Sequence, residues 1–136
     1  MSSSEQRLWR LRRFWLVIGW LWIVAIWYLS LVTPPPKLDP GFTFGDKILH
    51  AGAYGVLMAW FLQLYHRRDS RITCMLSFVG MGVLLEYLQS MTDFRTLEFA
   101  DMLANATGVL LAWIIVRGRV SNLLLNVEKF LQRQHE

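Results

Sequence analysis

The sequence predicts an all-α membrane protein that crosses the bilayer four times, with both termini in the cytoplasm and a C-terminal amphipathic helix. Its length of 136 residues favours a single domain. Hydrophobic residues make up 54% of the chain and charged residues only 18%, a composition typical of polytopic membrane proteins. Basic residues flank the apolar runs instead of forming one solvated patch, which argues against nucleic acid as a partner.

Four apolar runs have the length of a membrane-spanning helix. The first follows an arginine-rich segment, as in a signal peptide, but its 19 residues make about 28 Å of helix. No small-x-small cleavage site follows it, so we expect an uncleaved transmembrane helix that ends at Thr33–Pro36. The predicted spans cover residues 14–32, 48–65, 72–91 and 99–116. A short polar loop, His66–Arg71, is expected between the second and third.

A fifth helix is predicted after the last span, over residues 120–131. Leu123, Leu124, Val127 and Leu131 recur at i, i+1, i+4 and i+8, which is the pattern of an amphipathic helix. We expect this helix to lie on the membrane surface. The alternative is a short soluble tail helix.

The basic residues also predict the orientation of the chain, because they mark cytoplasmic loops. Four arginines precede the first span, three follow the second, and Arg117 and Arg119 follow the fourth. In the loops after the first and third spans, basic and acidic residues nearly balance. Both termini are therefore predicted to be cytoplasmic, and these two loops to lie outside.

This orientation places the ionisable residues of the last three spans in the outer leaflet. Asp46, His50 and Tyr54 are spaced i, i+4, i+8 and so share a helix face. A carboxylate that faces lipid is costly, so we expect each polar set to face its neighbours. The sequence predicts one polar pocket that opens to the extracytoplasmic side, lined by Asp46, Lys47, His50, Tyr54, Glu86, Gln89, Asp101 and Asn105, with Arg95 at the rim.

The order and spacing of these residues resemble those of the VanZ-like family of small bacterial membrane proteins. The resemblance covers about residues 45 to 116, and the first span fits the same plan. One departure lies before Asp101, where Glu98 and Phe99 occupy less typical positions, and it concerns the outer loop. The motifs that carry the resemblance are Asp46-Lys47-x-x-His50 with Tyr54, Glu86-x-x-Gln89, Arg95 and Asp101-x-x-x-Asn105-x-x-Gly108.

The resemblance implies a multi-pass protein of the bacterial cytoplasmic (inner) membrane. One family member is associated with resistance to the glycopeptide antibiotic teicoplanin, so an effect on glycopeptide sensitivity is expected. No accepted biochemical activity comes with the family name. The expected partners are membrane lipids and a lipid-linked or peptidoglycan-type precursor of the envelope.

Three residues of the pocket are the candidates for catalysis: His50, Glu86 and Asp101. His50 titrates near neutral pH and can act as a general base, oriented by Asp46, Glu86 or Asp101. Glu86 is the candidate proton donor. Ser90 lies nearby, but no nucleophile motif surrounds it.

The other pocket residues are expected to bind the ligand. Lys47 and Arg95 suit a phosphate or carboxylate, and arginine does so through a bidentate fork. Tyr54 lies one turn from His50 and is expected to hold that ring by a hydrogen bond. The remaining ligand-binding candidates are Asp46, Gln89 and Asn105.

Two function classes stay open at this point: an enzyme that acts on an envelope precursor, and a non-catalytic binding or scaffold protein. In the second class the polar cluster only locks the helices together. A divalent metal on His50, Glu86 and Asp101 is argued against by the single histidine and the lack of a cysteine cluster, so no metal or cofactor is expected. A proton-coupled carrier needs a polar path across both leaflets, and the inner halves of the spans are apolar.

Overall fold

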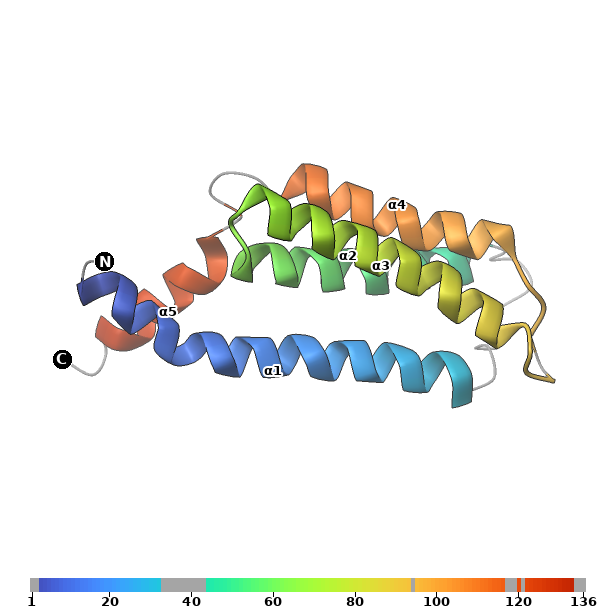
Figure 1. Ribbon diagram of the computed structural model, residues 1–136, viewed down its shortest axis with the longest axis horizontal. Helices are drawn as coiled ribbons and strands as arrows, with labels where there is room; N and C mark the ends of the chain where they lie inside the picture. The colour runs from blue at the N-terminus through green and yellow to red at the C-terminus, as the bar shows by residue number, and fades with distance from the viewer. Residues whose placement is uncertain (1–2, 33–43, 94, 117–119, 121, 134–136) are drawn as a thin grey trace.

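The computed structural model describes residues 3–32, 44–93, 95–116, 120 and 122–133. Within these residues it contains helices and no strand, which confirms the all-α class (Figure 1). The proline run after the first span, together with Arg117 and Arg119, lies outside the described residues. The helices are α1 (Ser3–Val32), α2 (Gly45–Leu64), α3 (Arg68–Gln89), α4 (Phe99–Ile115) and α5 (Leu123–Arg133).

Each helix overlaps its predicted segment, with one difference at the second connection. The predicted loop His66–Arg71 is shorter in the structure, because α3 already begins at Arg68. Arg67 precedes it in an extended conformation, with φ −70° and ψ 135°. Charged side chains are tolerated in the first turn because their polar ends remain exposed at the end of the bundle.

Two of the described helices are long and apolar enough to cross a membrane. They are the Leu11–Val32 part of α1, with a mean hydropathy of 2.1, and α3, with 1.5. Only 11% and 28% of these windows are buried, unlike the core helix of a soluble protein. The helix α4 is apolar but has 17 residues, about 26 Å of helix, and α2 has polar residues in its first turns. Crossing by α2 and α4 therefore stays a prediction.

The helices α2 and α4 approach each other most closely, and glycine makes this possible. A Cβ added to Gly108 would lie 2.9 Å from the Cα of Ala51 on α2, in the space of that backbone. A Cβ added to Gly55 would lie 3.3 Å from the carbonyl oxygen of Gly108. On α3, a Cβ added to Gly82 would lie 3.0 Å from the Cβ of Asn105. Close packing at Gly108 fixes the separation of α2 and α4.

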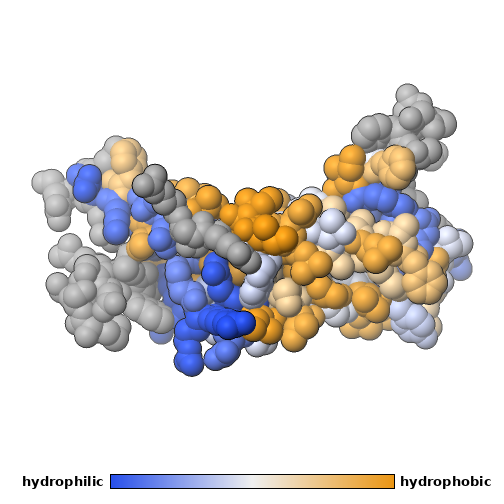
Figure 2. All heavy atoms as spheres, turned by 90° about the horizontal axis from the view of Figure 1, so that it is seen from above, coloured by the Kyte–Doolittle hydropathy of each residue, from blue (hydrophilic) through white to orange (hydrophobic). Residues whose placement is uncertain are grey.

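The core lies between α2, α3 and α4, and α1 packs against its side. Phe61 and Phe78 meet edge to face at 5.2 Å within this core. The α1 indole of Trp22 donates to the carbonyl of Ala53 on α2 at 3.3 Å. The other face of α1 exposes large apolar side chains, and Figure 2 shows that apolar residues cover the middle of one face of the molecule. The fully buried residues include Leu57, Met58, Leu62, Leu85 and Val109.

The two ends of the bundle carry different elements (Figure 1). At one end α1 and α3 finish and α2 and α4 begin; we call it the polar-cluster end. At the opposite end lie the start of α1 and the helix α5; we call it the α5 end.

The helix α5 is attached to the bundle by hydrogen bonds. The Trp15 indole donates to Glu128 Oε1 at 2.9 Å. The Gln63 side chain donates to the carbonyl of Val120 at 2.6 Å and accepts from the amide of Leu123 at 2.9 Å. The apolar side chains that remain exposed on α5 are Leu123, Val127, Phe130 and Leu131.

Candidate functional site

The polar cluster forms where α2 and α4 begin and α3 ends. Asp46 lies in the first turn of α2 and Asp101 in the first turn of α4. Carboxylates are favourable there because the unpaired N–H groups of a helix N-terminus carry partial positive charge. The close contact of α2 with α4 then brings the two acidic turns together. The cluster comprises Asp46, Lys47, His50, Tyr54, Glu86, Arg95, Glu98, Asp101 and Asn105.

Lys47 connects the start of α2 to the start of α4. Its Nζ lies 2.7 Å from Asp101 Oδ1 and 2.5 Å from Glu98 Oε2. Lys47 precedes the predicted span, and its ion pairs with Asp101 and then Glu98 raise its pKa above the ordinary value. The lysine is therefore charged, and its ammonium group already forms ion pairs with two carboxylates.

His50 is oriented by Asn105 rather than by a carboxylate. Its Nδ1 lies 3.0 Å from Asn105 Oδ1, and because an amide oxygen only accepts, Nδ1 carries the proton. Its Nε2 faces Asp46 Oδ1 at 3.8 Å and Asp101 Oδ2 at 3.7 Å. Both distances exceed hydrogen-bond length. The second ring nitrogen is therefore left facing two carboxylates across a gap.

Tyr54 does not hold the His50 ring, so that prediction is wrong. The tyrosine is buried, and its hydroxyl has no hydrogen-bond partner among the described residues. Its ring lies beside Gly82, since a Cβ there would come within 3.4 Å of Tyr54 Cε1 and 3.0 Å of the Asn105 Cβ. The tyrosine thus reaches toward α3 and leaves a buried hydroxyl unpaired.

Glu86 closes the cluster from α3. It is 1% exposed, and its Oε1 accepts the backbone N–H of Glu98 at 3.0 Å. Its Oε2 has no hydrogen-bond partner among the described residues, and neither has the half-buried Nε of Arg95. Unpaired buried polar atoms thus come from α2, from α3 and from the loop before α4.

Gln89 is buried, but its side-chain amide forms its hydrogen bond outside the polar cluster. Its Nε2 donates to the carbonyl of Ser30 on α1 at 3.0 Å. Gln89 therefore ties α3 to α1. This contact leads out of the polar cluster.

The predicted pocket is largely filled by its own side chains. The side chain of Asp101 is 3% exposed, whereas those of His50, Lys47 and Asp46 are 13%, 26% and 27% exposed. Solvent therefore reaches the cluster from the first turns of α2.

The VanZ/LLP1 family model matches residues 2–125 of the sequence. This chain belongs to the VanZ/LLP1 family. The match confirms the resemblance drawn from the motifs and extends it over the N-terminal helix and into α5. No curated protein and no solved structure matches the chain.

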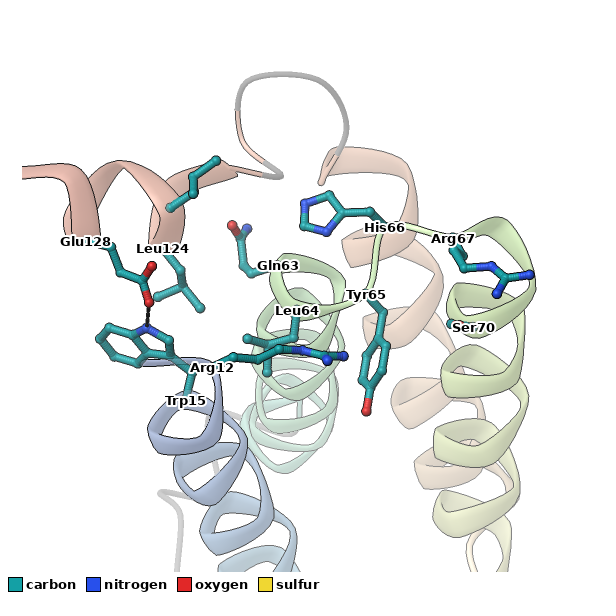
Figure 3. Close-up of a pocket in the computed structure, with 11 residues that line it drawn as sticks. Arg12, Trp15, Gln63, Leu64, Tyr65, His66, Arg67, Ser70, Leu124 and Glu128 are labelled. Carbon is teal, nitrogen blue, oxygen red and sulfur yellow. Dashed lines mark hydrogen bonds between the residues drawn. The ribbon is translucent and has the colours of Figure 1, made fainter. Parts of the chain in front are cut away.

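This VanZ/LLP1 protein also contains two cavities away from the polar cluster. One, of about 500 Å³, lies between α1, α2 and α3, with Phe61, Cys74 and Phe78 in its wall. The other, of about 380 Å³, lies at the α5 end and is shown in Figure 3. Neither was predicted.

The cavity at the α5 end is lined from four parts of the VanZ/LLP1 chain. Trp15 and Glu128 are joined by a hydrogen bond in its wall, and Arg12 lies over the ring of Tyr65, 5.5 Å from its centroid (Figure 3). Glu128 is buried, and desolvation raises its pKa against the opposing hydrogen bond from Trp15. In the sequence, the one indication of this cavity is the acidic residue Glu128, which lies one turn from Leu124 on an amphipathic helix.

Proposed function

We propose that this protein is a four-span protein of the bacterial cytoplasmic membrane that binds the anionic headgroup of a lipid-linked envelope precursor at its polar-cluster end. The observation that supports binding is a set of buried polar atoms that have no hydrogen-bond partner among the described residues: Tyr54 OH, Glu86 Oε2 and Arg95 Nε. A cluster that only joined helices would pair its buried groups, since each unpaired one costs about 1–3 kcal/mol. A bound ligand supplies the missing partners.

Arg95 is the residue we assign to the headgroup. Lys47 already binds two carboxylates, whereas Arg95 keeps an unpaired Nε. A guanidinium binds a phosphate through two parallel hydrogen bonds. His50 faces the accessible side of the cluster, where its Nε2 can accept a proton. Catalysis by His50, Glu86 and Asp101 is part of this proposal.

The orientation in the membrane follows from charge. Arg12, Arg67, Arg68 and Arg71 lie at the α5 end, which the bias of basic residues places in the cytoplasm. The polar-cluster end then faces outward, where peptidoglycan precursors are used. An effect on glycopeptide sensitivity is the expected cellular consequence.

A second function is favoured by a separate observation. Lys47 joins α2 to Glu98 and Asp101, Glu86 joins α3 to Glu98, and Gln89 joins α3 to α1. These bonds link all four long helices, as a non-catalytic scaffold requires. In that case the cluster stabilises the bundle and binds nothing.

Arg95→Gln separates the two functions. We expect the variant to bind a polyprenyl diphosphate at least about tenfold more weakly, because it loses one charge-assisted bidentate contact. The measurement is native mass spectrometry or microscale thermophoresis of the protein in nanodiscs. The matched control is Arg68→Gln at the α5 end, which should bind as the unaltered protein does.

The scaffold alternative gives a different result. It requires that Arg95→Gln and His50→Ala leave lipid binding and glycopeptide sensitivity of the host unchanged, while Glu86→Gln lowers only the thermal stability. Equal binding by Arg95→Gln and Arg68→Gln would overturn the headgroup assignment.

A further inference from the structure

Three donor atoms at the accessible side of the polar cluster face one another without bonding. They are Asp46 Oδ1, His50 Nε2 and a carboxylate oxygen of Asp101, and such atoms of the three residues all lie within 4.8 Å. The histidine lies 3.8 Å from Asp46 and 3.7 Å from Asp101. From this geometry we infer that Asp46, His50 and Asp101 bind a divalent metal ion of the zinc class.

The spacing fits such an ion with a small adjustment. Tetrahedral zinc with bonds of about 2.0–2.1 Å places neighbouring donors about 3.3 Å apart. The gaps of 3.7 and 3.8 Å from His50 to the two carboxylates close to that value by a few tenths of an ångström. The gap between the two carboxylates is within 4.8 Å and closes by up to about 1.5 Å through side-chain rotation. The set of His50, Glu86 and Asp101 considered from the sequence is not the one that gathers: among the described residues, the donor atoms that come together are those of Asp46, His50 and Asp101.

The outer contacts of the ligands are those that metal sites use. Asn105 accepts from His50 Nδ1, which fixes the ring and leaves Nε2 with its lone pair for the metal. Lys47 binds Oδ1 of Asp101, while Oδ2 is the oxygen that faces the histidine. The lysine and the metal therefore use different oxygens of one carboxylate.

The charge of the cluster also favours a cation. Its carboxylates are Asp46, Glu86, Glu98 and Asp101, and its cations are Lys47 and Arg95. The formal charge is therefore minus two when every carboxylate is ionised and His50 is neutral, and one divalent ion offsets it.

A buried group outside the triad gives independent support. Glu86 Oε2 has no hydrogen-bond partner among the described residues and belongs to a side chain that is nearly inaccessible. The Glu86 carboxylate interacts electrostatically with Asp101 and His50. A ligand at the triad, or water bound to it, supplies a partner for this oxygen.

The scaffold holds the ligands in place before any ion arrives. Asp46 and His50 stand one turn apart on α2, and Asp101 stands across from them on α4. The backbone contact of Gly108 with Ala51 lies between these same two helices. Preorganised donors on rigid elements bind metal without a cost of refolding.

Three protein ligands leave one coordination position open, as in catalytic zinc sites. A phosphate oxygen of the headgroup fits that position, with Arg95 beside it. This last step, unlike the metal site itself, rests on the proposed function.

The metal site is tested with the full-length, tag-free protein after treatment with a chelator. Zn²⁺ is titrated in competition with a chromophoric chelator, and one ion per chain is expected. Asp46→Asn and His50→Gln should each weaken binding by at least about tenfold, while His66→Gln, which alters an exposed histidine at the α5 end, should not. Thermal unfolding in excess chelator shows whether each variant still folds, and partly exposed Asp46 is the safer position.

Two results overturn the inference: zinc affinity unchanged in Asp46→Asn, or affinity lost in His66→Gln. Lipid binding is measured in a separate part of the experiment, which tests whether the metal ion contacts the headgroup. Polyprenyl diphosphate that binds equally with and without chelator, while Zn²⁺ binds as predicted, removes the bridging role and keeps the metal site. Zn²⁺ binding without any lipid binding removes the proposed function and also keeps the metal site.

Discussion

The two ends of the bundle handle polar groups in opposite ways. At the polar-cluster end, ionisable residues from α2, α3 and α4 lie within a few ångströms of one another, and little space is left between them. At the α5 end, Arg12 and Arg67 line a cavity of about 380 Å³ whose wall also contains one buried acid, Glu128 (Figure 3). The first end is organised by charge pairing and the second by a hollow that a short helix partly covers.

The difference comes from how each end is held. The polar-cluster end rests on the close contact of α2 with α4, where Gly108 meets the backbone of Ala51. The α5 end rests on single hydrogen bonds from Trp15 and Gln63. An element held by few contacts opens at low free energy. We therefore expect the polar-cluster end to be rigid and α5 to detach more readily.

The sharpest test of the comparison is which end faces outward. In a Cys74→Ser background, a cysteine at exposed Phe44 should react fully with an impermeant maleimide added to intact cells, and a cysteine at exposed Asp69 should not. The measurement is gel-shift labelling before and after permeabilisation. Labelling of Asp69→Cys alone would reverse the orientation and move the proposed site to the cytoplasm.

The next largest effect is expected at the α2–α4 contact. Gly108→Ala should lower stability by at least about 2 kcal/mol, because the new methyl group overlaps the backbone of Ala51. The thermal unfolding temperature in detergent should fall by roughly 5 °C or more. Gly80→Ala is the matched control, since no atom lies within 4 Å of a Cβ there. Equal loss in both variants would contradict the close contact.

The smallest effect concerns Glu128 and pH. Burial raises its folded-state pKa above the ordinary 4.5, so its protonated form is favoured when α5 is docked. Docking is then strongest below pH 4.5 and weakens as pH rises through the folded-state pKa. Hydrogen exchange of the α5 amides, corrected for intrinsic rates, should show a few-fold loss of protection between about pH 5 and about pH 8.

Glu128→Gln tests the cause of this pH effect. The glutamine keeps an oxygen that accepts from Trp15, so the variant should stay docked with no pH dependence over the same range. Lys129→Gln on the exposed side of α5 is the control. A pH dependence that survives Glu128→Gln would mean that another group controls the docking of α5.

Much of the fold could be predicted because apolar length and flanking charge are local properties. The helices α1 to α4 begin and end within a few residues of the predicted spans, except that α1 extends back to Ser3 and α3 to Arg68. Hydropathy does not show these extensions, because charged residues at a helix end are compatible with either a loop or a helical turn.

The members of the polar cluster could be named from the sequence, but not their partners. Spacing on one helix shows that Asp46 and His50 share a face. It does not show that Asn105, rather than Tyr54 or a carboxylate, meets the ring of His50. That choice depends on how closely α2 and α4 approach, which the glycines set in three dimensions.

The α5 end was harder to predict for the same reason. Trp15 and Glu128 are 113 positions apart, and neither stands out in its own segment. Their contact exists only because α5 folds back onto the start of α1.

Glu98 has a consequence for how the proposed ligand would reach the site. Its carboxylate binds the Lys47 ammonium at 2.5 Å while its side chain is about half exposed, and its backbone amide is held by Glu86. The chain thus supplies its own anion to the lysine. A phosphate that reached Lys47 would have to compete with the Glu98 carboxylate. Because the Glu98 backbone is anchored separately, we expect that its carboxylate can move aside without disturbing the start of α4.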